Sequence, residues 1–159
     1  MKTRIISAFP GTGKSTYHAK HPDTTLDSDS SSFSWITVDG EKVRNPDFPA
    51  NYIEHIKENI GKYEFIFVSS HKEVRDALKE NCLFFYLMYP YEDKKEIYLQ
   101  RYKDRGNQEA FIELLDRNWD AWIRECQFEI YGCSNVELLI SYNIEAEIEH
   151  IIMSENGDE

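Results

Sequence analysis

The segment that most constrains the fold is "RIISAFPGTGKST" at residues 4–16. A short apolar run rich in β-branched residues leads into a stretch with two glycines, and a helical pattern follows from about Lys14 until Pro22. Such runs are typical of buried strands, and glycine lets the backbone turn sharply between a strand and a helix. The segment therefore predicts a strand, a loop and a helix at the start of an α/β domain.

Strand and helix patterns alternate along the rest of the chain. Near-continuous apolar runs bounded by polar residues predict buried strands at 64–70 and 82–90, and residues 24–27 and 135–141 are further strand candidates. Helices are expected over 70–79, where Ser70 and Glu73 have capping-box spacing, over 92–131 with a break near Gly106, and over 144–152. This alternation predicts an α/β fold of three layers, α/β/α, with a five-stranded parallel sheet in one domain of residues 1–159.

The glycine loop, residues 9–16, has the groups that a phosphate-binding loop needs. Gly11 and Gly13 give the backbone the freedom to turn its N–H groups inward around Thr12, and the loop leads into a helix N-terminus. Lys14 supplies a cation, Ser15 a hydroxyl for Mg²⁺, and Thr16 a second hydroxyl. The full motif G-x-x-x-x-G-K-[ST] opens with a glycine, and this chain has Ala8 there.

The string "FPGTGKST" resembles the loop of small P-loop kinases, which include nucleoside-monophosphate, shikimate, gluconate and polynucleotide kinases. The chain is also similar to kinase-like proteins encoded by bacteriophages. The resemblance implies a P-loop NTPase fold, ATP and Mg²⁺ as cofactors, an acceptor-binding insertion at 30–62 and a helical lid region at 94–118. It covers the order of elements over the whole chain, but residues match only at a few places.

Two aspartates in "TTLDSDSSSF" follow the second predicted strand. The carboxyl ends of parallel strands gather ligand groups, so Asp27 and Asp29 are expected to face the glycine loop. The "DSD" string resembles the pair in shikimate kinases, which implies that Asp27 lies on the metal side with Ser15. It also implies that Asp29 touches the acceptor and takes the proton of its hydroxyl. A polar loop or a helix cap is the alternative interpretation.

Arginines provide the second group of candidates. Arg44 and Arg75 stand where the acceptor-binding arginines of nucleoside-monophosphate kinases would be, although exposed, solvated arginines would give the same pattern. Residues 94–105 hold five positive and two negative side chains, with Arg101 and Arg105 four residues apart on one helix face. The resemblance implies lid arginines that neutralise the transferring phosphoryl group, and a solvated helix face is the alternative.

Two features bear on nucleotide binding. The predicted strand at 64–70 ends "FVSSH", without the aspartate that motor ATPases and GTPases use for the metal. Tyr142 and Asn143, after the last predicted strand, are candidates for an adenine pocket by analogy with the fold.

Charge and composition restrict the kinds of partner and the location that we expect for the protein. The net charge is −11, and residues 125–159 contain nine acidic side chains but no Lys or Arg. This balance argues against a grip on long nucleic acid. The apolar runs are too short to cross a membrane, and three cysteines without a C-x-x-C pair suggest reduced thiols in a cytoplasmic protein.

The leading hypothesis is an ATP- and Mg²⁺-dependent phosphotransferase acting on a nucleotide, such as a nucleoside monophosphate. One alternative is a kinase for the hydroxyl of a small metabolite or of a polynucleotide 5′ end. Another is a regulatory module that binds nucleotide without catalysis. The sequence does not determine the acceptor, the choice between ATP and GTP, or the oligomeric state.

Overall fold

A five-stranded sheet forms the centre of the computed structural model, which describes residues 1–138 and 144–157. The strand order is β2-β5-β1-β6-β7, and all four neighbouring pairs are parallel. The strands are β1 (Arg4–Ala8), β2 (Thr25–Asp27), β5 (Phe65–Ser69), β6 (Phe85–Pro90) and β7 (Cys133–Leu138). The predicted parallel sheet is confirmed. The last strand begins two residues before its predicted start, and residues 139–141 of that prediction lie outside the described residues.

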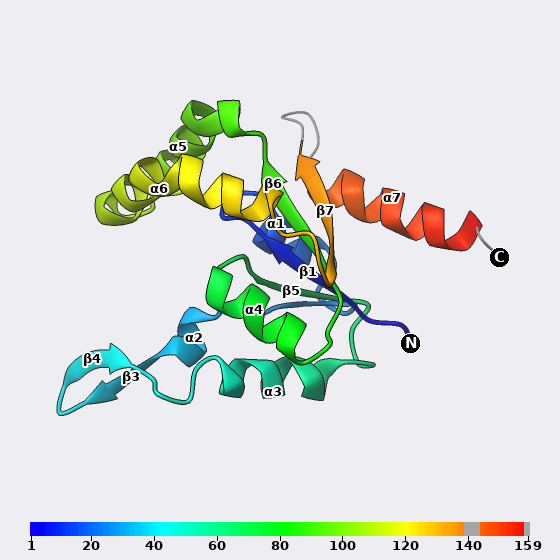
Figure 1. The fold of residues 1–159 in the computed structure, drawn as a ribbon, viewed down its shortest axis with the longest axis horizontal. Coiled ribbons are helices and arrows are strands. Elements are labelled where there is room, and N and C mark those ends of the chain that lie inside the picture. The colour runs from blue at the N-terminus through cyan, green and yellow to red at the C-terminus, as the bar shows by residue number, and fades with distance from the viewer. Residues whose placement is uncertain (139–143, 158–159) are drawn as a thin grey trace.

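Helices cover both faces of the sheet and complete the predicted three layers (Figure 1). One core cluster joins the sheet to the four helices α3 (Ala50–Asn59), α4 (Lys72–Glu80), α5 (Lys95–Asp104) and α6 (Glu109–Gln127). A second cluster joins the opposite face to α1 (Lys14–Lys20) and α7 (Ile144–Gly157). Neighbouring residues of β1 serve the two cores alternately, because Ile5 belongs to the first cluster and Ile6 to the second.

The carboxyl end of β1 is the topological switch point of the sheet. The chain leaves β1 toward β2 through α1, on one face, whereas it leaves the neighbouring strands β5 and β6 through helices on the other face. Right-handed crossovers impose this arrangement, because the connection after β1 runs in the opposite direction along the sheet. Loops therefore diverge at the end of β1, which is where open parallel sheets bind ligands.

The insertion contains a β-hairpin that the sequence analysis did not predict. After a short helix α2 (Ser31–Ser34), strands β3 (Trp35–Val38) and β4 (Glu41–Arg44) pair antiparallel and extend away from the sheet (Figure 1). Asp39 and Gly40 form the turn with positive φ of 51° and 80°, as a two-residue hairpin turn requires. Every residue of both strands is exposed. Helix α3 follows the hairpin.

Several helix boundaries differ from the predicted ones, because α6 ends at Gln127 rather than 131 and α7 continues to Gly157 rather than ending at 152. The predicted break in residues 92–131 is confirmed, since a short 3₁₀ turn at Glu92–Lys94 leads into α5 and α6 begins at Glu109. The predicted capping box at Ser70 is wrong. Helix α4 begins at Lys72 with His71 as its N-cap residue and has no side-chain cap, because Ser70 lies one residue too early. The Ser70 carbonyl accepts a hydrogen bond from Arg75 Nε at 2.9 Å. In the described residues, no helix has both the length and the apolar character needed to span a membrane.

Candidate functional site at the carboxyl edge of the sheet

The glycine loop connects β1 to α1 at the switch point. Gly11 and Gly13 have φ of +84° and +105°, a region that residues with a Cβ rarely adopt. Thr12 is buried and donates its hydroxyl to the Phe9 carbonyl at 2.8 Å, which fixes the bend. Within residues 1–138 and 144–157, the backbone N–H groups of Gly11, Thr12 and Gly13 donate no hydrogen bond. The loop thus offers three unused donors, as an anion-binding turn does.

Helix α5 packs directly on this loop. The Tyr102 hydroxyl donates to the Pro10 carbonyl at 2.7 Å, and Arg101 donates to the Gly11 carbonyl at 3.2 Å. A Cβ placed on Gly11 would lie 2.8 Å from Cε1 of Tyr102 and 3.2 Å from Cδ1 of Tyr98. Glycine is therefore needed here for close approach as well as for its backbone conformation. The predicted lid region is in contact with the predicted phosphate loop.

Lys14 lies among charges of both signs. Its Nζ donates to the Ala8 carbonyl at 2.5 Å. Burial lowers the pKa of Lys14 to about 8, although Asp27 and Asp29 oppose this shift, and Arg105 lowers the pKa further. The structure thus brings four predicted site residues near one another. An anion bound beside the ammonium would favour its charged form and raise this pKa.

The predicted metal pair is also brought together. The Ser15 hydroxyl donates to Oδ2 of Asp27 at 2.8 Å. Oxygen ligands of this kind suit Mg²⁺, which usually keeps several waters and takes only one or two carboxylates from the protein. No group of three or more His, Cys, Asp or Glu side chains that could hold a metal occurs in the part of the chain that the structure describes. The pair therefore fits an ion shared with a phosphate rather than a closed protein cage.

Asp29 is exposed beyond the end of β2, and its Oδ1 accepts the backbone N–H of Ser31 at 2.9 Å. The second carboxylate oxygen has no hydrogen bond within the described residues.

His71 was missed by the sequence analysis. Desolvation by the surrounding protein lowers the pKa of His71. The cations Lys14 and Arg44 lower this pKa further, whereas Asp29 raises it. A polar residue directly after a buried parallel strand was the signal that could have found it.

Arg44 extends from the hairpin toward this edge. It is exposed, pairs with Glu73 at 3.1 Å, and its guanidinium carbon lies 5.3 Å from the centre of the Phe48 ring. Its effect on the pKa of His71 shows that its charge is felt at the carboxyl edge. Thr16 is exposed on the first turn of α1.

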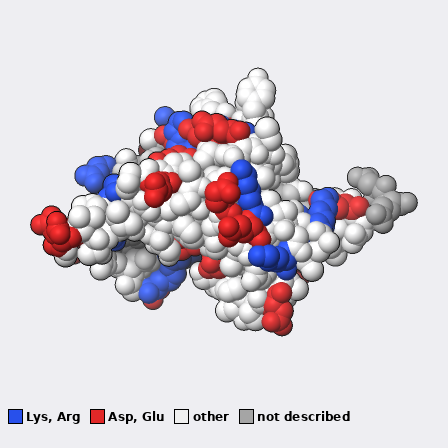
Figure 2. All heavy atoms as spheres, turned by 90° about the horizontal axis from the view of Figure 1, so that it is seen from below, with Lys and Arg blue, Asp and Glu red and all other residues white. Residues whose placement is uncertain are grey.

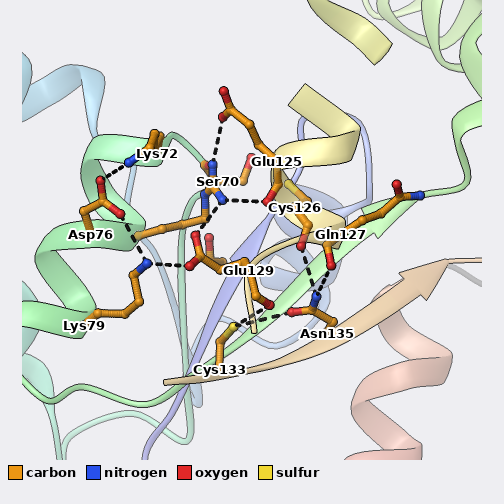
Figure 3. Close-up of polar contacts among 12 residues, drawn as sticks. Ser70, Lys72, Asp76, Lys79, Glu125, Cys126, Gln127, Glu129, Cys133 and Asn135 are labelled. Atoms are coloured by element: carbon orange, nitrogen blue, oxygen red, sulfur yellow. Dashed lines mark hydrogen bonds and ion pairs between the residues drawn. The ribbon is translucent and has the colours of Figure 1, made fainter. Parts of the chain in front are cut away.

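Arg75 does not have the free guanidinium that an acceptor-binding role requires. Its side chain is 2% exposed and contacts Glu125, in the last turn of α6, at 3.1 Å and Glu129, two residues beyond that helix, at 2.9 Å. Figure 3 shows the two glutamates, with Lys79 pointing toward Glu129. Lys79 also bonds Glu129. The Arg75 side chain thus joins α4 to the end of α6 and the residues that follow it. Its acceptor-binding role stays a prediction.

Tyr142 and Asn143, the predicted adenine-pocket residues, lie outside the described residues. No protein-family model matches the chain, and no match is found among curated proteins.

Proposed function

We propose that this protein is an ATP- and Mg²⁺-dependent phosphotransferase built on a P-loop kinase fold. The observation that carries the proposal is the meeting of two segments at the switch point. Lys14 and Ser15 come from the glycine loop, and Asp27 and Asp29 come from the end of β2. These groups supply a cation for phosphate, oxygen ligands for a divalent ion and a free carboxylate oxygen within one site.

The chain's own groups suggest a division of labour. The unused N–H groups of the glycine loop and the Lys14 ammonium would hold the terminal phosphates of ATP. Ser15 and Asp27 would hold Mg²⁺, which neutralises phosphate charge when it is bound. Arg101, which donates to the Gly11 carbonyl, and Arg105, whose charge acts on Lys14, would neutralise charge on the transferring group.

The transfer step then needs a base. The bond between the γ-phosphorus and its bridging oxygen breaks, ADP leaves, and a new bond forms from phosphorus to the acceptor oxygen. For a hydroxyl acceptor, the displaced proton goes to Asp29. The exposed carboxylate oxygen of Asp29, near Lys14, favours a hydroxyl acceptor.

A nucleoside monophosphate is the second candidate acceptor. Arg44 favours it, because this cation acts at the carboxyl edge and is exposed. The engagement of Arg75 with two glutamates counts against it, because only one of the two predicted phosphate-binding arginines is then available.

The test is transfer of labelled phosphate from ATP and Mg²⁺ to a panel of nucleoside monophosphates, nucleosides, small hydroxyl metabolites and a 5′-hydroxyl oligonucleotide. The parent is compared with Lys14→Ala and Asp29→Ala, and with Lys62→Ala as an exposed control outside the site. We expect label on an acceptor hydroxyl that is lost with Lys14 and with Asp29 but kept in the control. A labelled diphosphate that is insensitive to Asp29 would support the nucleotide kinase instead. ATP binding without any transfer would contradict both and leave a nucleotide-binding module.

A further inference from the structure

One face of the hairpin combines an aromatic ring with two cations. Trp35 pairs with Arg44 and Thr37 pairs with Lys42, so these four side chains share a face. The Lys42 Nζ lies 5.0 Å, and the Arg44 guanidinium carbon 5.1 Å, from the centre of the Trp35 ring. The acidic residue of the two strands, Glu41, lies on the opposite face. The face therefore carries two cations around an indole, and one of them, Arg44, also pairs with Glu73.

This face is open to solvent. Trp35 is 38% exposed and the hairpin extends away from the sheet (Figure 1). Lys42 and Arg44 are two residues apart along β4, which separates their backbones by about 7 Å in a strand. Small ligands usually bind in concave pockets that cover most of their surface. An open aromatic ring with cations spaced along it is instead how proteins bind single-stranded nucleic acid, through base stacking and phosphate contacts.

The face of the hairpin that carries Trp35, Lys42 and Arg44, called the platform below, stands next to the candidate site. Trp35 follows Asp29 across the short helix α2, a single turn of about 6 Å. Arg44 links the two regions, because it contacts the Trp35 ring and also affects the pKa of His71 at the carboxyl edge. A strand lying on the platform would therefore have its end near Asp29.

We propose that Trp35, Lys42 and Arg44 bind the 5′-terminal segment of a single-stranded nucleic acid. A base stacks on Trp35, flanking phosphates contact Lys42 and Arg44, and the terminal 5′-hydroxyl reaches Asp29. The last of these contacts rests on the proposed phosphotransferase function, whereas binding to the platform does not. Acidic and basic groups are interspersed on the face seen in Figure 2, so the grip we propose is local and covers a few nucleotides.

The test measures binding of a labelled 5′-hydroxyl oligothymidylate, about eight nucleotides long, by fluorescence anisotropy without ATP or Mg²⁺. Trp35→Ala should weaken binding by roughly fivefold to a hundredfold, and Trp35→Phe, which keeps a stacking ring, should retain most of it. Lys42→Ala should lower the slope of log affinity against log salt by about 0.7. Tyr131→Ala and Lys62→Ala remove an exposed ring and an exposed cation elsewhere and should change neither quantity.

Binding that is unchanged by Trp35→Ala, or weakened equally by the control variants, would overturn the proposal. Competition by free thymidine monophosphate at the same nucleotide concentration would also overturn it, because the platform would then serve a mononucleotide. The two proposals fail separately. A strand that binds through Trp35 but is never phosphorylated contradicts only the kinase, and phosphorylation of another acceptor without strand binding contradicts only the platform.

Discussion

Gly11→Ala tests whether α5 holds the glycine loop. The new Cβ would lie 2.8 Å from Cε1 of Tyr102, well inside the contact distance of about 3.5–4.0 Å between carbon atoms. Alanine in the left-handed region costs about 1–2 kcal/mol, and forcing a packed ring aside costs about 1–3 kcal/mol more. We therefore expect the free energy of unfolding to fall by about 2–5 kcal/mol.

Gly106→Ala is the matched control, because Gly106 also has a positive φ, +77°, but a Cβ there would meet nothing within 4 Å. It should cost only the backbone strain of about 1–2 kcal/mol. Urea denaturation of both variants measures the difference. In a Tyr102→Ala background, the extra cost of Gly11→Ala should shrink toward that of the control. Equal losses, within about 0.5 kcal/mol, in Gly11→Ala and Gly106→Ala would refute the packing of α5 on the loop.

Three further predictions concern the ion pairs and the metal pair. Arg75→Ala should destabilise the fold by about 1.5–3 kcal/mol in urea denaturation, because the buried hydrogen bonds of Arg75 to Glu129 and to the Ser70 carbonyl are lost while Lys79 still pairs with Glu129. The exposed Arg44→Ala should cost below about 1 kcal/mol. The hydrogen bond from Arg4 lowers the pKa of Glu155 from 4.5 to about 2, so its contribution to stability is present above pH 4.5 and lost as pH falls toward 2. Glu155→Gln should remove this part of the pH dependence of the urea midpoint between pH 6 and 3, and an unchanged profile would exclude the Arg4 contact. Asp27→Asn should raise the Mg²⁺ concentration for half-maximal transfer about tenfold or more, and an identical Mg²⁺ titration would remove Asp27 from the metal site.

The sequence predicted β1, β5 and β6 because each is a largely apolar run, readable without knowledge of its partners. The signal was weaker for β2 and β7, which contain polar residues. The hairpin was different. Its strands, "WITV" and "EKVR", bury nothing, so they lack the apolar signal that marked the others. The dipeptide Asp39–Gly40 carried the information, because both residues adopt the positive φ that this turn needs.

The candidate site also has a part that the sequence predicts and a part that it does not. Lys14, Ser15, Asp27 and Asp29 were placed together because the ends of parallel strands meet at one edge, a rule that needs no side-chain detail. The partners of Arg75 could not be found this way. Glu125 and Glu129 lie at least 50 residues further along the chain and meet Arg75 only because the end of α6 packs beside α4.

The central position of β1 has a consequence for how the molecule is made. Residues 4–8 leave the ribosome before either of the strands with which they pair, β5 at residues 65–69 and β6 at residues 85–90. The glycine loop is therefore attached to a strand that lacks at least one of its partners until both β5 and β6 have been synthesised. Such non-local pairing is slow and exposes strand edges to other chains meanwhile. The two strand pairings that flank the glycine loop can both be complete only after β6 has been synthesised.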